Sequence, residues 1–340
     1  MANDAPLLKV EELRTTFYTD DGEIPAVDSI SFDIHKGEIL GVVGESGCGK
    51  SVTSLSVMGL VPSPPGKIDG GKILFKEEDL VQVSESRMRD LRGNEIAMIF
   101  QEPMTSLNPV FTIGNQLIEA IRIHKKWSKG KAKQRAVEIL KQVGLPRAEE
   151  LLSEYPHQLS GGMRQRVMIA MAMACEPELL IADEPTTALD VTIQAQILAL
   201  MKKLNEDTNT AVMLITHDLG VVAEVCERII VMYSGKVVEQ GTVKEIFQNP
   251  QHPYTKGLIQ SVPDMRYKKD KLYSIPGNVP KPGSIKSGCR FAPRCEVALE
   301  RCTTETPELY KTGNEHCTRC FLYDGTTKEG TKDGRGTVTS

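Results

Sequence analysis

Apolar and polar positions alternate along the first part of the chain in a way that predicts strands. Residues 7–43 contain three such stretches, LLKVEEL, SISFDI and EILGVVG, separated by breaks at 20–22 and 36–37. Period-two alternation is typical of half-buried strands, and short continuous apolar runs are typical of buried ones. The stretch 51–60 follows and is predicted to be a helix that ends before Pro62.

The middle of the chain changes to helices and then to a regular alternation. A short buried strand is predicted at 96–100, and helical spacing over 113–152 predicts a helical insertion. From residue 161 onward the pattern predicts helix 163–174, strand 179–183, helix 191–207, strand 211–216, helix 218–225 and strand 228–232. This alternation indicates an α/β fold whose mostly parallel sheet is covered by helices.

The end of the chain differs from the rest. Prolines become frequent after Gly241, which predicts an appended segment. Residues 326–340 show no apolar periodicity and are predicted to be a disordered tail. We therefore expect a main domain over 1–245 and an extension over 246–325.

Composition narrows the class of protein. The 340 residues, 25% of them charged, suffice for a full core, and the net charge of −4 argues against a nucleic-acid binder. The N-terminal sequence MANDAPLLKVEEL does not resemble a secretion signal. The longest apolar run, 167–175, is far shorter than the roughly 20 residues that span a bilayer. We expect a soluble chain, which leaves docking on a membrane protein open.

The stretch 44–51, GESGCGKS, fits the phosphate-binding pattern GxxxxGK[ST]. It follows an apolar strand and opens a helix, so its backbone N–H groups are placed to wrap phosphates. In this pattern Lys50 reaches the β- and γ-phosphates, and the Ser51 hydroxyl binds Mg²⁺. The alternative is a chance match in a turn. The candidate nucleotide contacts are Gly44, Glu45, Ser46, Gly47, Cys48, Gly49, Lys50, Ser51 and Val52.

Polar residues end three of the predicted strands. Asp183 and Glu184 follow an apolar run, where Asp183 suits Mg²⁺ binding and Glu184 suits a general base. The alternative is that both cap the next helix. His217 and Gln101 also end strands; they could contact the γ-phosphate and Mg²⁺ or water, or be structural.

A second glycine-rich turn lies at 159–166, LSGGMRQR, at the start of a predicted helix. Free N–H groups and the helix dipole make such a helix end an anion site. The candidate residues are Ser160, Gly161 and Gly162. Because 44–51 already supplies a phosphate site, this turn raises the question of whose phosphate it binds.

Taken in order, GESGCGKS, Gln101, LSGGMRQR, LLIADE, Ala188-Leu189-Asp190 and His217 resemble the ATPase subunit of an ABC transporter. The resemblance covers roughly residues 7–245. It implies a P-loop NTPase fold of the ABC nucleotide-binding type, with a RecA-like core, an antiparallel β subdomain and a helical subdomain at about 103–165. It also implies ATP hydrolysis with Mg²⁺.

The resemblance assigns roles to individual residues. The stretch 44–51 corresponds to the Walker A loop, Asp183 to the Walker B acid, Glu184 to the catalytic carboxylate and His217 to the switch histidine. Gln101 corresponds to the sensor that faces the membrane subunits and joins Ser51 and Asp183 around Mg²⁺. Asp190 is a further nucleotide-site position, and Phe17 would stack on adenine. Tyr18 is the fallback for that role, and either residue could instead pack in a strand. Met163 departs from the commonest signature, LSGGQ.

The resemblance also implies partners. In this family the signature serine and glycines bind the γ-phosphate held by the opposite subunit, so two ATPases form a head-to-tail dimer. The expected partners are a second, related ATPase subunit, two transmembrane permease subunits and, indirectly, an extracytoplasmic peptide-binding protein. We expect a peripheral protein on the cytoplasmic face of the membrane.

Three further stretches resemble the dipeptide and oligopeptide importers: 155–166, 101–109 and 249–255. Nickel importers are closely similar, so a nickel importer ATPase is one alternative. A soluble ABC ATPase without a transport role is another.

Five of the eight cysteines lie between 289 and 320, with the spacing C-x5-C-x6-C-x14-C-x2-C. In a reducing compartment such a cluster favours a metal site over disulfides. Zinc, a [4Fe–4S] cluster and reduced packing cysteines are the alternatives, and the wide spacing suits the iron–sulfur cluster better than zinc. Peptide-importer ATPases have a similar segment reported to hold a [4Fe–4S] cluster. That resemblance selects Cys289, Cys295, Cys302 and Cys320, with Cys317 as the spare ligand.

Overall fold

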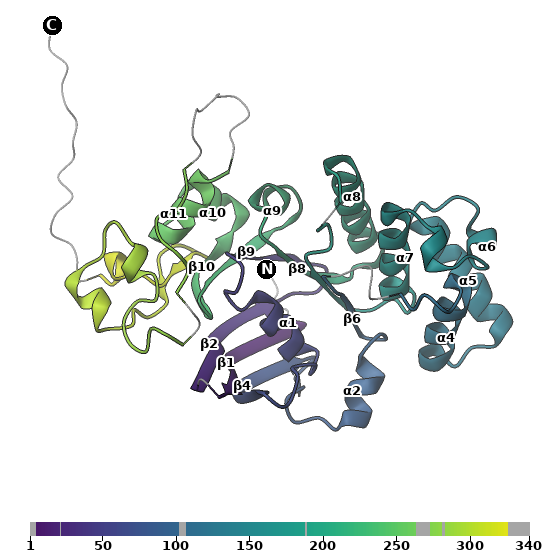
Figure 1. Ribbon diagram of the computed structural model, residues 1–340, viewed down its shortest axis with the longest axis horizontal. Helices are drawn as coiled ribbons and strands as arrows, with labels where there is room; N and C mark the ends of the chain where they lie inside the picture. Colours follow the sequence, from purple (N-terminus) through teal and green to yellow (C-terminus); the bar gives the residue numbers. More distant parts are fainter. Residues whose placement is uncertain are drawn as a thin grey trace, which may run out of the picture.

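The computed structural model describes residues 5–20, 22–101, 107–187, 189–262, 273–280 and 283–325. Two sheets form its centre, with a group of helices at one end and the C-terminal segment at the other (Figure 1). The smaller sheet is antiparallel, in the order β2-β1-β4-β5. Its strands are β2 (Gly22–Ile34), β1 (Leu8–Thr19), β4 (Gly66–Phe75) and β5 (Glu78–Asp79).

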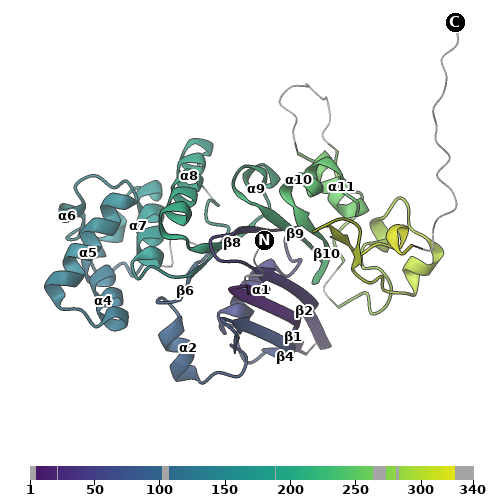
Figure 2. The ribbon, with the colours of Figure 1, turned by 180° about the vertical axis from the view of Figure 1, so that it is seen from behind.

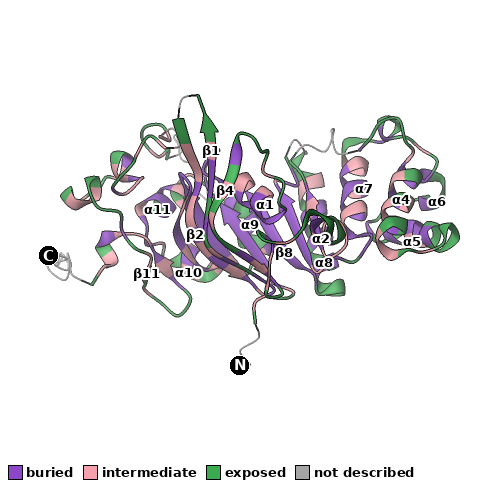
Figure 3. Ribbon diagram, turned by 90° about the horizontal axis from the view of Figure 1, so that it is seen from below, coloured by how far each residue is buried: buried purple, intermediate pink, exposed green. Residues whose placement is uncertain are grey.

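The larger sheet has the order β11-β12-β10-β9-β3-β8-β7-β6 in the described part of the chain. Its strands are β3 (Ile39–Val43), β6 (Ile96–Ile99), β7 (Leu179–Asp183), β8 (Ala211–Thr216), β9 (Arg228–Tyr233), β10 (Lys236–Thr242), β11 (Tyr310–Lys311) and β12 (Cys317–Thr318). Strands β9, β3, β8, β7 and β6 are parallel, as the alternation predicted. Their continuous apolar sequences are buried on both faces, as in parallel sheets covered by helices (Figure 3).

Helices cover this sheet on both sides. Helix α1 (Lys50–Val57) lies between the two sheets, and α7 (Gly161–Met173), α8 (Val191–Thr208) and α9 (Leu219–Val225) follow the strands of the larger sheet (Figure 1). The predicted start of α7 at Met163 is wrong by two residues. Ser160 is the N-cap and accepts a hydrogen bond from the Met163 N–H, so both signature glycines belong to the first turn.

The expected helical insertion consists of α4 (Ile113–Lys125), α5 (Lys129–Gln142) and α6 (Ala148–Leu151). Its apolar stripe is buried at Leu117, Ile121, Ala136 and Leu140, which form one core with α7. Figure 2 shows this group at the opposite end of the molecule from the C-terminal segment. No helix in the described ranges has the length and apolar character that crossing a membrane requires.

The C-terminal segment begins with α10 (Val243–Gln248) and α11 (Pro253–Gln260) and returns to the sheet through β11 and β12. Strand β12 pairs with β10, where Glu239 faces Thr318 and Gln240 faces Cys317. The segment therefore extends the central sheet. The predicted disordered tail, 326–340, lies outside the described residues.

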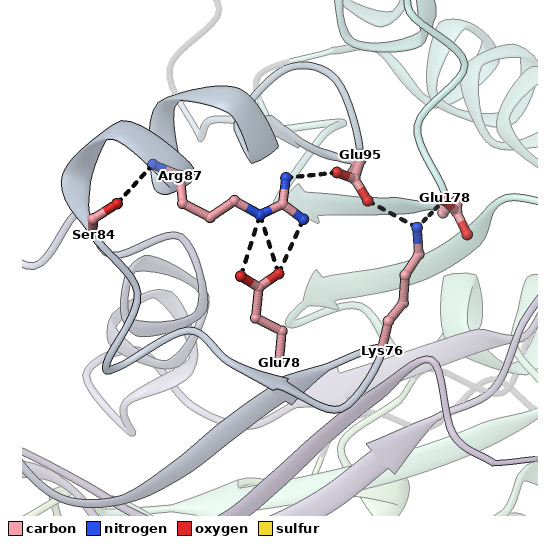
Figure 4. Close-up of polar contacts among 6 residues, drawn as sticks. All are labelled: Lys76, Glu78, Ser84, Arg87, Glu95 and Glu178. Carbon is pink, nitrogen blue, oxygen red and sulfur yellow. Dashed lines mark hydrogen bonds and ion pairs between the residues drawn. The ribbon is translucent and has the colours of Figure 1, made fainter.

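A network of charged side chains joins the two sheets (Figure 4). Lys76, next to the β4–β5 turn, forms ion pairs with Glu95 (2.8 Å) and Glu178, which precede β6 and β7. Arg87 of α2 (Glu85–Leu91) pairs with Glu78 and Glu95, both at 3.0 Å. These partly exposed pairs contribute modestly one by one, but together they connect the small sheet to the starts of two core strands.

Candidate functional site

The loop 44–49 joins β3 to α1 and has a backbone shape that glycine alone allows at two positions. Gly44 has φ 153°, and a Cβ there would lie 2.2 Å from the Met232 carbonyl oxygen. Gly49, the N-cap of α1, has φ 104°, and a Cβ would lie 2.5 Å from the Ala26 carbonyl oxygen. The glycines let the loop pass close to other backbone while it curls around the start of a helix.

Lys50 lies inside this loop. Its side chain is only 5% exposed, and its Nζ donates to the carbonyl oxygens of Gly44 (2.7 Å) and Glu45 (3.2 Å). The Cys48 sulfur lies 3.8 Å from the same nitrogen, and burial raises the pKa of the Cys48 thiol, so it stays neutral. The ammonium group is therefore held where phosphate oxygens could replace the carbonyls, and Ser46 and Gly47 are exposed at the rim.

Asp183 ends β7 beside this loop and is 3% exposed. Burial raises the pKa of Asp183, while a hydrogen bond from Ser51 and the charge of Lys50 act in the opposite direction. Its Oδ1 has no hydrogen-bond partner among the described residues. A buried carboxylate oxygen without a partner, next to a serine hydroxyl, is an oxygen donor set that fits Mg²⁺.

Glu184 follows directly and has a left-handed backbone with φ 48°. Its Oε2 accepts from Thr187 Oγ1 (2.9 Å) and Gln101 Nε2 (3.3 Å), and its Oε1 lies 3.4 Å from His217 Nδ1. Burial raises the pKa of Glu184, but Thr187 and His217 outweigh it, so the pKa is lowered from its usual value. Strained backbone in a non-glycine residue is a feature of functional sites.

The structure thus brings three sequence candidates, Gln101, Glu184 and His217, to one point at the carboxyl ends of β6, β7 and β8. His217 is 66% exposed and reaches Glu184 from the loop after β8. Thr187 was missed by the sequence analysis, although it stands three residues after the acidic pair. Residues 102–106 and Ala188, which belong to motifs used in the sequence analysis, lie outside the described residues.

The glycine turn at 160–162 is a separate feature. Ser160 and Asp190 are exposed N-caps of neighbouring helices, α7 and α8, and Asp190 accepts from the Ile193 N–H at 2.9 Å. A Cβ on Gly162 would lie 3.2 Å from the Ile193 side chain. Among the described residues no hydrogen bond joins this turn to the loop 44–51.

The adenine candidates lie on β1. Phe17 is half-buried and pairs with Gly66, where a Cβ would lie 3.0 Å from the Phe17 ring. Tyr18 is more exposed, and a hydrogen bond to Asp69 raises its pKa. Both residues lie near the C-terminal end of β1, an inner strand of the small sheet, and Val52 lies half-buried in α1.

The cysteine candidates lie in the C-terminal segment. Cys289, Cys295, Cys302 and Cys320 line one small apolar cavity, whereas Cys317 lines a different hollow with Gln240 and Lys311. Burial raises the pKa of Cys289 and of Cys320 to about 11. Within the described residues, no group of three or more His, Cys, Asp or Glu side chains is arranged to hold a metal ion.

Comparisons with known proteins cover nearly the whole chain. Residues 27–187 match the family model described as ABC transporter, and residues 238–302 match the model described as oligopeptide/dipeptide transporter, C-terminal region. The chain is 56% identical to the oligopeptide transport ATP-binding protein AppD of Bacillus subtilis over 94% of this chain and 97% of that protein. It is 52% identical to the dipeptide transport ATP-binding protein DppD of the same organism, over 94% and 95% of the two chains.

Solved structures agree with these relatives. The dimeric post-hydrolysis state of the ATP-binding cassette MJ0796, bound to ADP and Pi, superposes with a TM-score of 0.62 at 29% identity. The match covers 69% of this chain and 98% of that one. CbiO1 of Clostridium perfringens gives the same TM-score over 72% and 92% of the two chains.

Proposed function

This chain belongs to the ATP-binding subunits of oligopeptide and dipeptide ABC transporters, and we propose that the residues around Lys50 and Glu184 form the site with which it hydrolyses ATP to drive peptide import. One observation carries the assignment of the site. A carboxylate with a lowered pKa, Glu184, is held by three polar side chains beside a loop shaped for phosphates.

The residues of the loop bind and orient ATP. The N–H groups of 44–51 and the ammonium of Lys50 contact the β- and γ-phosphates and offset their charge. Asp183 and Ser51, with Gln101, would hold Mg²⁺, which supplies charge neutralisation on the phosphate oxygens when bound. His217 would contact the γ-phosphate from the end of β8. Phe17, with Tyr18 as the alternative, would stack on the adenine.

Glu184 acts on the attacking water. Its ionised carboxylate accepts the water proton as the oxygen bonds to the γ-phosphorus and the bond to the β–γ bridging oxygen breaks. ADP and phosphate leave. Thr187 and Gln101 fix the carboxylate, so its basic oxygen is held in one direction before ATP binds.

The second anion turn serves another subunit in this proposal. Ser160 and Gly161 are exposed and Gly162 is half-buried, and no hydrogen bond among the described residues joins them to the chain's own phosphate loop, which supports binding to the γ-phosphate of a partner ATPase. Asp190 caps the neighbouring helix at the same surface. We propose a related second ATPase, two transmembrane permease subunits and, indirectly, an extracytoplasmic peptide-binding protein as partners, with the chain on the cytoplasmic face of the membrane.

The division of the chain into 1–245 and 246–325 is also a proposal. The separate family matches over 27–187 and 238–302 support it.

Glu184→Gln tests the catalytic assignment. The amide keeps the size of the side chain but cannot accept the water proton, so steady-state ATP hydrolysis should fall by about 10²–10⁴-fold. ATP binding to the full-length chain should persist and favour a closed dimer. Glu206→Gln, the same chemical change at an exposed glutamate near the C-terminal end of α8, serves as the control. Hydrolysis at the normal rate in Glu184→Gln would show that another group is the base.

We also propose that the C-terminal segment holds a [4Fe–4S] cluster. The four cysteines chosen for it share one cavity and Cys317 does not, which supports that ligand set. Four thiolates are the donor set that such a cluster uses, and it would act as a structural staple for this small segment. An anaerobic preparation should contain about four irons per chain. Stoichiometric zinc, or no metal, would overturn it.

A further inference from the structure

The loop 44–51, called the phosphate loop below, is contacted by the part of the C-terminal segment that carries the five cysteines, residues 289–320, which is called the cysteine-containing segment. Arg294 donates to both carboxylate oxygens of Glu45, from Nη1 to Oε2 at 2.7 Å and from Nη2 to Oε1 at 3.1 Å. The Glu45 backbone N–H donates to Tyr254 Oη at 2.8 Å. Lys50 binds the carbonyl oxygen of the same residue. The N–H, the carbonyl and the side chain of Glu45 therefore all have fixed partners.

All the N–H groups of the Arg294 guanidinium have hydrogen-bond acceptors. Its side chain is 4% exposed, and its remaining N–H groups donate to Pro276 O (2.8 Å), Ile275 O (3.3 Å) and Tyr233 Oη (3.3 Å). Together with the two bonds to Glu45, these contacts supply an acceptor for each of the five N–H donors of a guanidinium. The fork geometry allows one orientation only, so Arg294 positions Glu45 rather than following it.

The position of Arg294 is set by the thiol-lined cavity. It stands next to Cys295, and Phe291 of the same short turn lines the cavity and packs against Tyr233 and Tyr254, with ring centroids 5.2 and 5.4 Å apart. These aromatic contacts fix the turn that presents the guanidinium to the phosphate loop.

The cysteine-containing segment also supports the phosphate loop indirectly, through the turn between β9 and β10. Arg290 bonds to Asp28 and to the Ser234 carbonyl oxygen. The next residue, Gly235, donates its N–H to the Cys48 carbonyl oxygen at 2.8 Å. The phosphate loop is thus braced at Glu45 directly and at Cys48 through the β9–β10 turn.

The charge of Glu45 explains why this contact matters for nucleotide binding. An unpaired carboxylate inside a phosphate-binding loop would repel the negative charge of the nucleotide. Arg294 neutralises this carboxylate with a side chain that is 4% exposed, while the Glu45 side chain is 28% exposed. Two charge-assisted hydrogen bonds make the pair strong, and the loss of one partner is costly.

We propose that Arg294 is a positioning residue for nucleotide binding, through which the cysteine-containing segment holds the phosphate loop and cancels the charge of Glu45. The proposal rests on the assignment of 44–51 as the ATP-binding loop. It adds that the C-terminal segment sets the affinity of that loop for nucleotide.

Affinity for MgADP, measured with a fluorescent ADP on the full-length chain, tests this proposal. ADP has no γ-phosphate, so its affinity measures binding at the chain's own phosphate loop and does not depend on the glycine turn of a partner ATPase. Arg294→Gln should weaken binding about tenfold, and adding Glu45→Gln should restore it to within about threefold of wild type, because the repelling charge is gone. In the assembled transporter Arg294→Gln should raise KM for ATP and leave kcat within about twofold.

Arg301→Gln is the matched control. Arg301 stands next to Cys302 and pairs with Glu305 and Asp324 inside the segment, away from the phosphate loop. The Arg301→Gln variant should bind ADP as wild type does. If Arg301→Gln weakens binding as much as Arg294→Gln, or if Glu45→Gln gives no rescue, the proposal is wrong. Tyr254→Phe, which removes only the acceptor of the Glu45 N–H, should weaken ADP binding about threefold even if Arg294→Gln fails to fold.

The outcome separates this proposal from the proposed function. A wild-type chain that does not bind ADP, or a Lys50→Ala variant that binds normally, would contradict the ATP-site assignment. Normal binding by Arg294→Gln and Tyr254→Phe, with Lys50→Ala defective, would overturn only the role of Arg294.

Discussion

Replacing Glu239 with alanine should detach the C-terminal segment from the core. The Glu239 carboxylate is fully buried in β10 and accepts from the N–H groups of Gln251 (2.7 Å) and His252 (2.9 Å). It also lies 2.7 Å from His316 Nε2. One side chain thus connects the central sheet, the start of α11 and the loop before β12.

The free-energy cost of Glu239→Ala follows from the buried groups that lose their hydrogen-bond acceptor. Two backbone N–H groups and a buried imidazole lose their acceptor, and each such group costs about 1–3 kcal/mol. Toward the lower end of that range, the three losses together cost about 3–4 kcal/mol. Glu239→Gln keeps the shape and one acceptor oxygen, so it should cost less, about 1–3 kcal/mol. Because the lost contacts are local, the segment should open before the whole core unfolds.

Amide hydrogen exchange measures this local opening. In Glu239→Ala the amides of Gln251, His252 and Thr318 should exchange about 100- to 1,000-fold faster, which corresponds to the cost above. Helices α4 and α5, at the far end of the molecule, should exchange as in wild type. The exposed Glu227 offers a control, and Glu227→Ala should leave all these rates unchanged. Unchanged exchange in Glu239→Ala, or equal acceleration in α4 and α5, would refute the reasoning.

Two further predictions concern the ATP site. Ser160→Arg should leave ADP binding at the chain's own loop intact and lower ATP hydrolysis in the assembled transporter, whereas loss of its own ADP binding would contradict a role in trans. Thr187→Val removes a hydrogen bond that lowers the pKa of Glu184, so that pKa should rise. Since the base must be ionised, the pH below which hydrolysis is lost should be higher in Thr187→Val than in wild type. Thr187→Ser, which keeps the hydroxyl, should retain the wild-type pH profile, and an unshifted acid limb in Thr187→Val would count against Glu184 as the base.

The sequence predicted the parallel core well because its signals are local. The apolar run before Gly44 and the run ending at Asp183 each fit a buried strand followed by polar chemistry, and the structure has β3 and β7 there. Strand β4 was not predicted. Its sequence, GKIDGGKILF, contains three glycines and several exposed polar residues, and its pairing with β1 decides its conformation.

Contacts between distant parts of the chain were beyond sequence patterns. Strand β12 has two residues, too few to show a period, and exists because β10 lies beside it. Arg294 and Glu45 are 249 positions apart, and neither motif spacing nor composition connects them. The left-handed backbone of Glu184 is likewise imposed by its surroundings, since its N–H donates to the Ile215 carbonyl oxygen of the neighbouring strand at 2.9 Å.

The pairing of β10 with β12 has a consequence for protein engineering. A chain cut after residue 245 would leave β10 as a bare edge strand, with the Glu239 carboxylate stripped of its partners, and such an edge invites aggregation. Chimeras that exchange C-terminal segments between related ATPases should therefore carry β9, β10 and the turn between them along with the segment. The proposed boundary after residue 245 is therefore not a point at which the molecule can be divided.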